Sequence, residues 1–213
     1  MNTKSDQIRQ AYDRWASIYD TNENPTRDLD AQVLRNLPVD FRDKTVVEAG
    51  CGTGKHTAWL AGVAREVVAF DISQAMMARA KEKVVGKPVT FLVHDLTSPW
   101  PLPDAFCDIV TINLVLEHVE KLSFVFGEAF RILRPEGVLC VVELHPQKQA
   151  NGSKARFEDP ATGEPVILPT FPHTEAEFRQ AGREAGFKTV EIQDWWDNTE
   201  EIPRLLSVVC RKT

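Results

Sequence analysis

Three glycines in one short loop, Gly50, Gly52 and Gly54, follow an apolar run at residues 45–49 and precede a helical pattern. Glycine adopts positive φ and has no Cβ, so a ligand could lie against the backbone amides where a strand ends. Asp71 ends the next apolar run, at a spacing of about twenty residues that is typical of an acid holding both hydroxyls of an adenosine ribose. The alternative is a tight turn followed by a solvated aspartate. Together, the loop and the acid predict a site for an adenosine-containing cofactor.

The spacing of the glycines favours one kind of cofactor over others. A dinucleotide fingerprint, G-x-G-x-x-G, would need glycine where Lys55 stands, so NAD and FAD are disfavoured. A P-loop would need glycine, lysine and a hydroxyl residue at positions 55 to 57, which are Lys55, His56 and Thr57. An NAD-dependent oxidoreductase is therefore the weaker alternative. A non-catalytic cofactor-binding protein is the other alternative.

Three histidines are candidates for a general base near neutral pH. His118 follows the fourth expected strand, His145 ends the fifth, and His173 lies just before the last expected helix. All three are expected at the ligand-binding edge of the sheet. Each also has a structural interpretation, as a helix-start or loop histidine bonded to backbone.

The elements that must position these residues alternate between runs of β-forming residues and helical patterns. This alternation predicts a parallel sheet with right-handed crossovers. Ser73 is expected to cap a helix over residues 74–84, and Thr174 with Glu177 forms a capping box before a last helix. The expected strands are residues 45–49, 66–70, 89–93, 108–113, 137–143, 189–194 and 204–210.

The length of 213 residues fits one domain over residues 1–213 with additions. Residues 1–40 are expected to form an N-terminal helical cap, in which Tyr12, Trp15 and Tyr19 recur at helical spacing. Residues 146–172 are expected to form an inserted hairpin or loop near the active site.

Composition and charge exclude several classes of protein. The formal net charge is −6 and no basic stripe is present, so a nucleic-acid substrate is not expected. The longest apolar runs are too short to span a bilayer and the start of the chain has no signal core, so we expect a cytoplasmic protein. The four cysteines are too scattered for a zinc site or a disulfide framework, and no metal site is expected. A monomer or a homodimer is compatible with the sequence.

Five segments, in the right order, resemble the class I S-adenosylmethionine-dependent methyltransferases, specifically the small-molecule enzymes related to the ubiquinone and menaquinone methyltransferases. Residues 48–54 match the E/D-x-G-x-G-x-G signature of that family. The other matching segments are residues 12–20, 71–73, 93–96 and the pair 106–119 and 131–137. The resemblance covers nearly the whole chain.

This resemblance implies a Rossmann-like α/β fold: a seven-stranded, mostly parallel sheet with the last strand antiparallel and helices on both faces. It implies the cofactor S-adenosyl-L-methionine and a small-molecule methyl acceptor, methylated by in-line displacement. Tyr19 would either help to pack the first helix on the sheet or act as a lid over the cofactor, and Asn113 would lie beside the reacting centre. The remaining cofactor residues implied by the resemblance are Glu48, Gly50, Gly52 and Gly54 around the methionine part, Asp71 on the ribose, and Ile72, Asp95 and Leu96 around the adenine.

Overall fold

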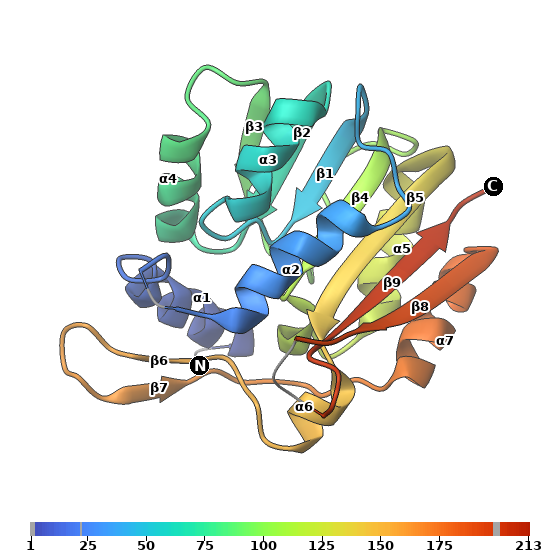
Figure 1. Ribbon diagram of the computed structural model, residues 1–213. Helices are drawn as coiled ribbons and strands as arrows, with labels where there is room; N and C mark the ends of the chain where they lie inside the picture. Colours follow the sequence, from blue (N-terminus) through green and yellow to red (C-terminus); the bar gives the residue numbers. More distant parts are fainter. Residues whose placement is uncertain (1–2, 22, 198–200) are drawn as a thin grey trace.

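A mixed sheet of seven strands forms the centre of the protein in the computed structural model, which describes residues 3–21, 23–197 and 201–213 (Figure 1). The strand order is β3-β2-β1-β4-β5-β9-β8, and β9 runs antiparallel to both of its neighbours. The predicted mostly parallel sheet with an antiparallel last strand is confirmed. The strands are β1 Thr45–Ala49, β2 Glu66–Asp71, β3 Val89–Val93, β4 Cys107–Asn113, β5 Leu133–Leu144, β8 Thr189–Trp195 and β9 Leu205–Arg211.

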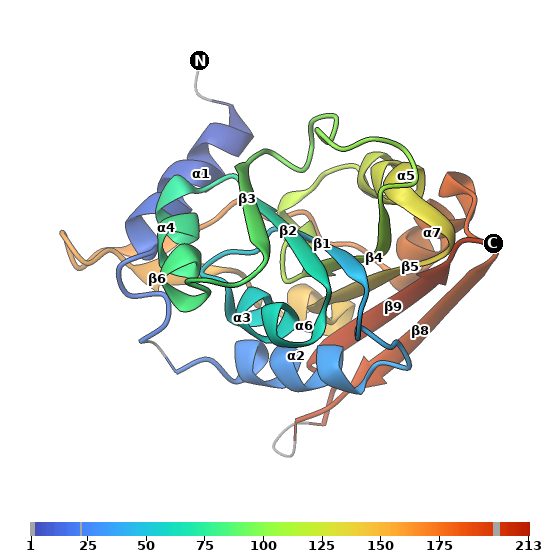
Figure 2. The same cartoon turned by 90° about the horizontal axis from the view of Figure 1, so that it is seen from above.

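Helices cover both faces of the sheet (Figure 2). On one face, α2 and α3 bury apolar side chains such as Leu34 and Leu60. On the other, α5 and α7 pack Phe126 and Phe178 against the strands. The helices are α1 Lys4–Trp15, α2 Pro25–Asn36, α3 Lys55–Val63, α4 Gln74–Lys83, α5 Leu122–Ile132, α6 Pro146–Ala150 and α7 Glu175–Ala185.

Local signals fixed most boundaries of these elements. The Ser73 hydroxyl accepts a hydrogen bond from the Met76 amide at the start of α4, and the capping box of Thr174 and Glu177 opens α7, as predicted. Strand β5 is longer than predicted. It begins at Leu133, which pairs with Cys107 before the register of the β4–β5 pairing shifts. Because this first part of the strand is irregular, the sequence alone does not show a strand pattern there.

The segment after β5 contains the predicted hairpin, formed by β6 Arg156–Glu158 and β7 Pro165–Ile167. The one-turn helix α6 before it was not predicted. The hairpin packs on α1: the rings of Trp15 and Phe157 stack with centroids 4.8 Å apart, and Arg14 pairs with Asp159 at 2.8 Å. Helix α1 and the hairpin therefore form one layer over the carboxyl edge of the sheet (Figure 1).

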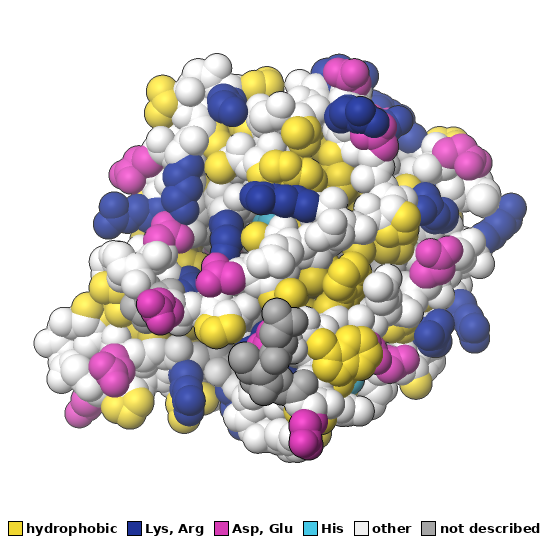
Figure 3. Space-filling view, in the orientation of Figure 1, with side chains coloured by type: hydrophobic (Ala, Val, Ile, Leu, Met, Phe, Trp, Pro, Cys, Tyr) yellow, Lys and Arg dark blue, Asp and Glu magenta, His cyan; other side chains and the backbone are white. Residues whose placement is uncertain are grey.

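The surface carries both signs of charge. Basic and acidic side chains are interspersed over the face seen in Figure 3. All four cysteines are buried free thiols. Within the described part of the chain, no helix has the length and apolar character needed to cross a membrane.

Candidate active site

A cavity of about 390 Å³ lies at the carboxyl edge of the sheet, where the loops after β1, β2, β3 and β4 meet. Strand β1 pairs with β2 on one side and with β4 on the other, so the strand order reverses at this point. Open parallel sheets bind ligands at such a reversal. Nine residues predicted for the site line the cavity: Tyr19, Gly50, Gly52, Asp71, Ile72, Asp95, Leu96, Asn113 and His118.

The three glycines of the loop meet three different requirements. A Cβ on Gly50, at φ +80°, would lie 2.3 Å from Cγ2 of Val115 in the loop after β4. Position 50 therefore requires glycine. A Cβ on Gly52, at φ +51°, would meet no other atom within 4 Å, because this residue faces the cavity. Gly54 does not line the cavity, and its missing Cβ lets Ala80 of α4 approach the loop. Only two of the three predicted glycines therefore face the cavity.

Asp71 is partly buried, lines the cavity and organises the glycine loop. Its Oδ2 accepts a hydrogen bond from the Gly52 amide at 2.8 Å, and its Oδ1 accepts one from the Ser73 amide at 2.8 Å. Burial raises the pKa of this carboxyl to about 6, although the two amides oppose the shift. The Ser73 hydroxyl donates to Asp13 of α1 at 2.7 Å, so α1 is tied to the same turn.

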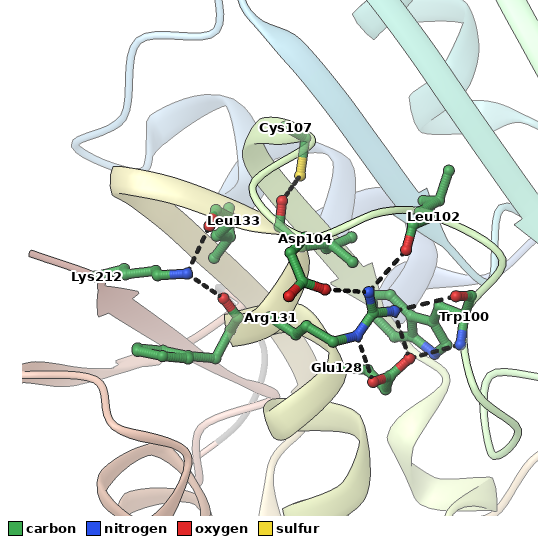
Figure 4. A network of polar contacts seen from close by, with 10 residues as sticks. Trp100, Leu102, Asp104, Cys107, Glu128, Arg131, Leu133 and Lys212 are labelled. Carbon is green, nitrogen blue, oxygen red and sulfur yellow. Dashed lines mark hydrogen bonds and ion pairs between the residues drawn. The ribbon is translucent and has the colours of Figure 1, made fainter.

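A fixed loop between β3 and β4 presents Asp95 and Leu96 to the cavity. The Asp95 carboxylate accepts hydrogen bonds from the amide and hydroxyl of Thr97, and the indole of Trp100 donates to the Leu96 carbonyl at 3.0 Å. Arg131 of α5 holds the rest of the loop through the network drawn in Figure 4. Its guanidinium donates to the carbonyls of Trp100 and Leu102 and to the carboxylates of Glu128 and Asp104.

A chain of hydrogen-bonded polar side chains forms part of the cavity wall. Asn113 donates to Asp30 at 2.7 Å, and Asp30 bonds His56 at 2.6 Å. The Asn113 carbonyl oxygen has no hydrogen-bond partner among the described residues, and this side chain lines the cavity. Glu48 does not line the cavity, because its carboxylate points back into the protein and accepts a hydrogen bond from the Thr57 hydroxyl at 2.6 Å.

His118 is the predicted histidine that the structure places at the cavity. Its Nδ1 lies 2.8 Å from the Pro169 carbonyl oxygen, which can only accept, so Nδ1 carries a proton. Its Nε2 lies 2.8 Å from the hydroxyl of Tyr12. Burial lowers the pKa of His118 below its usual value, so the ring is neutral at pH 7 and Tyr12 donates to Nε2.

His145 and His173, the other two candidate bases expected at this edge of the sheet, do not line the cavity, because both rings bond elsewhere. His145 Nδ1 accepts from the Gln147 amide at 3.2 Å, and its Nε2 bonds Asp194 at 3.2 Å. The buried His173 Nε2 donates to the Val119 carbonyl at 2.7 Å. These bonds fix the starts of α6 and α7.

Sequence reasoning missed two cavity residues that now stand out, Tyr12 and Arg27. Tyr12 belongs to a helical stripe, and its aromatic spacing was the available signal for it. Arg27 stacks on the ring of Tyr19 at 4.2 Å from the centroid and donates to the Tyr19 carbonyl. No local sequence pattern marks Arg27, because it reaches the cavity only through the tertiary packing of α2.

The buried carboxyl of Glu143 should make the stability of the protein depend on pH. Its Oε1 accepts hydrogen bonds from the amides of Val115 and Leu116, at 2.8 and 2.7 Å, and burial raises its pKa to about 8. A carboxyl with a raised folded-state pKa binds more protons in the folded than in the unfolded protein between its two pKa values. Its contribution therefore lowers stability as the pH rises from about 4.5 to about 8.

We compare the free energy of unfolding of Glu143→Gln with that of the natural protein at pH 5 and at pH 8. The difference should shift in favour of Glu143→Gln by roughly 1–3 kcal/mol between these two pH values. The glutamine keeps an oxygen for the two amides but carries no charge. Urea unfolding at several pH values measures the difference, and Glu66→Gln, which alters an exposed side chain, serves as the control. Parallel pH profiles for the natural protein and Glu143→Gln would contradict the assignment.

Comparison with known proteins agrees with this geometry. Residues 47–141 match a family model described as a methyltransferase domain. An uncharacterized methyltransferase of Emericella nidulans is 30% identical over 220 residues, which cover 86% of this chain and 76% of that protein. A malonyl-[acyl-carrier protein] O-methyltransferase of Pectobacterium atrosepticum is 32% identical over 143 residues, which cover 67% of this chain but only 55% of that protein.

Solved structures show the same fold. The DhpI–SAH complex is 26% identical, with a TM-score of 0.74 over 98% of this chain and 96% of that one. An S-adenosylmethionine-dependent methyltransferase from Mesorhizobium loti is 21% identical, with a TM-score of 0.72 over 85% of this chain and 96% of that one. The matching sequence, fold and cavity together show that the chain belongs to the class I S-adenosylmethionine-dependent methyltransferases.

Proposed function

We propose that this methyltransferase transfers its methyl group to a small-molecule acceptor. The observation that carries the proposal is the cavity of about 390 Å³, which is lined by Gly50, Gly52 and Asp71 and also by Asn113 and His118. S-adenosylmethionine bound on the glycine loop and Asp71 would share this cavity with the polar groups of Asn113 and His118. The interspersed surface charges (Figure 3) favour a small acceptor over a nucleic acid.

The residues in the cavity fit the parts of the cofactor. The open face of Gly52 leaves room for the methionine part, and the Asp71 carboxylate would accept hydrogen bonds from the ribose hydroxyls. Ile72 and Leu96 would pack on the adenine, with Asp95 at its edge. The unpaired oxygen of Asn113, and the ring of Tyr19 as a lid, would face the amino acid end. Glu48 and Gly54 would support the loop from behind.

Bound S-adenosylmethionine supplies an electrophilic methyl group, so the protein must chiefly position the acceptor in line and exclude water. For an acceptor hydroxyl or amine, a base is also needed. The Tyr12 hydroxyl already donates to His118 Nε2 at 2.8 Å. In our proposal Tyr12 takes the acceptor proton as it passes its own to Nε2, and His118 becomes a cation held by the Pro169 carbonyl.

Calorimetric titration with S-adenosylhomocysteine, with NADH as the control, tests the cofactor site without knowledge of the acceptor. We expect saturable binding of the first and none of the second. Binding of NADH alone would favour the oxidoreductase alternative and overturn the proposal.

Release of S-adenosylhomocysteine from S-adenosylmethionine in the presence of small hydroxyl, amine and carboxyl compounds tests turnover. Malonyl thioesters belong in the set because one relative acts on malonyl-[acyl-carrier protein]. Cofactor binding without methyl transfer to any acceptor would favour the non-catalytic alternative.

A further inference from the structure

A second cavity, of about 440 Å³, opens beside the cofactor cavity. The two cavities share Tyr12, Tyr19, Asn24, Arg27 and Leu114 in their walls. The outer wall of the second cavity comes from the segment between β5 and the hairpin. An acceptor bound in the second cavity would therefore lie directly beside the cofactor.

Cations dominate the second cavity, although the whole chain carries a net charge of −6. Among the residues that the structure describes, one carboxylic residue, Glu117, lines the cavity, and burial raises its pKa to about 7, so this group is partly neutral near pH 7. The basic side chains come from three parts of the chain. They are Arg27, Lys148, Lys154, Arg156 and Arg204.

Two of these cations, Lys148 and Arg204, lie close enough to affect each other. The pKa of Lys148 is lowered from its usual value, first by partial burial and then by the positive charge of Arg204. Arg204 pairs with Asp197 and also donates to the Thr26 hydroxyl at 3.1 Å. Gathering like charges at one place costs electrostatic free energy, which an anionic ligand would offset.

Two residues that line this cavity each carry a buried polar atom with no hydrogen-bond partner among the described residues, Trp15 Nε1 and Glu117 Oε2. Trp15 is 6% exposed and Glu117 is 8% exposed. A buried donor left unpaired costs about 1–3 kcal/mol, so such groups usually meet a ligand or water. Glu117 Oε1 lies 4.0 Å from His118 Nε2, which places these atoms at the junction with the cofactor cavity.

We propose that the second cavity binds the methyl acceptor and that this acceptor carries a carboxylate or phosphate group. The basic side chains of the α6 and β6 segment and Arg204 hold the anion. Trp15 and Glu117 contact the part of the acceptor that faces the cofactor. This inference rests on the proposed function, because it assigns the ligand of the neighbouring cavity to the same reaction.

The test is a titration of the ¹⁵N-labelled protein, saturated with S-adenosylhomocysteine, with succinate and with inorganic phosphate at constant ionic strength. Succinamide and chloride are the controls. We expect saturable shifts of amide signals in residues 148–156 with at least one anion and with neither control. A response to succinate alone assigns a carboxylate, and a response to phosphate alone assigns a phosphate.

Variants locate the binding. Lys148→Gln combined with Arg156→Gln should weaken anion binding at least about 10-fold, while Lys87→Gln combined with Arg183→Gln removes the same charges from exposed sites elsewhere and should have no effect.

Two results would overturn the inference. In the first, S-adenosylhomocysteine binds, so the cofactor site is intact, but neither anion gives a saturable response. In the second, both double variants weaken anion binding equally, which would show nonspecific screening. Failure to bind S-adenosylhomocysteine would instead overturn the proposed function itself, and this inference with it.

Discussion

Asp71→Ala is expected to weaken binding of S-adenosylhomocysteine by roughly 5- to 150-fold, or about 1–3 kcal/mol. The proposed hydrogen bonds to the ribose would be lost. The carboxylate also accepts hydrogen bonds from the amides of Gly52 and Ser73, so the glycine loop loses its anchor. Both effects act on the same cavity, and calorimetric titration measures their sum.

Two control variants separate these effects. Asp71→Asn keeps one oxygen for the amides but removes the charge, so it should bind more tightly than Asp71→Ala and more weakly than the natural protein. Asp40→Ala removes an exposed carboxylate whose partner is Arg42 and should leave affinity unchanged. Unaltered affinity in Asp71→Ala, with a normal unfolding transition, would refute the ribose assignment.

Much of the fold was predictable because its signals are local. Alternating apolar runs located the seven strands of the sheet to within a few residues. The Ser73 cap and the capping box at Thr174 marked where α4 and α7 begin, because each cap satisfies amides of its own first turn. Helix α6 escaped prediction because one turn is too short to show a period.

The site was less predictable because its contacts join distant parts of the chain. The loop and Asp71 could be found, since the spacing of this motif is itself the signal. The partner of His118 could not, because Tyr12 lies 106 residues away in sequence. His145 lies at the expected end of a strand and His173 just before an expected helix, yet the direction of each ring depends on a backbone group or carboxylate that no periodicity reveals.

The glycines illustrate the same limit at closer range. The motif marks Gly50, Gly52 and Gly54 alike, but neighbours from other elements give each its own requirement. Val115 after β4 excludes a side chain at Gly50, and Ala80 of α4 excludes one at Gly54. Sequence spacing therefore identifies the loop, whereas tertiary packing decides which of its residues face the ligand.

The second large effect is expected at His118, where His118→Ala should slow methyl transfer by about 10²–10⁴-fold with a hydroxyl or amine acceptor. Affinity for S-adenosylhomocysteine should change little, because His118 is not among the residues proposed to bind the cofactor. Tyr12→Phe should give a similar loss, since in our proposal the proton passes through its hydroxyl. The double variant should be no slower than the slower single variant, because the two residues act in one path.

The protonation state of His118 can be measured without an acceptor. We expect ¹⁵N NMR of the imidazole at pH 7 to show a proton on Nδ1, which bonds the Pro169 carbonyl, and an unprotonated Nε2. A histidine whose folded-state pKa is lowered resists protonation, so the folded protein should lose stability as the pH falls below about 6.5. In His118→Ala this loss should diminish. A protonated Nε2 at pH 7 would exclude His118 as the base, because no lone pair would remain to take the proton from Tyr12.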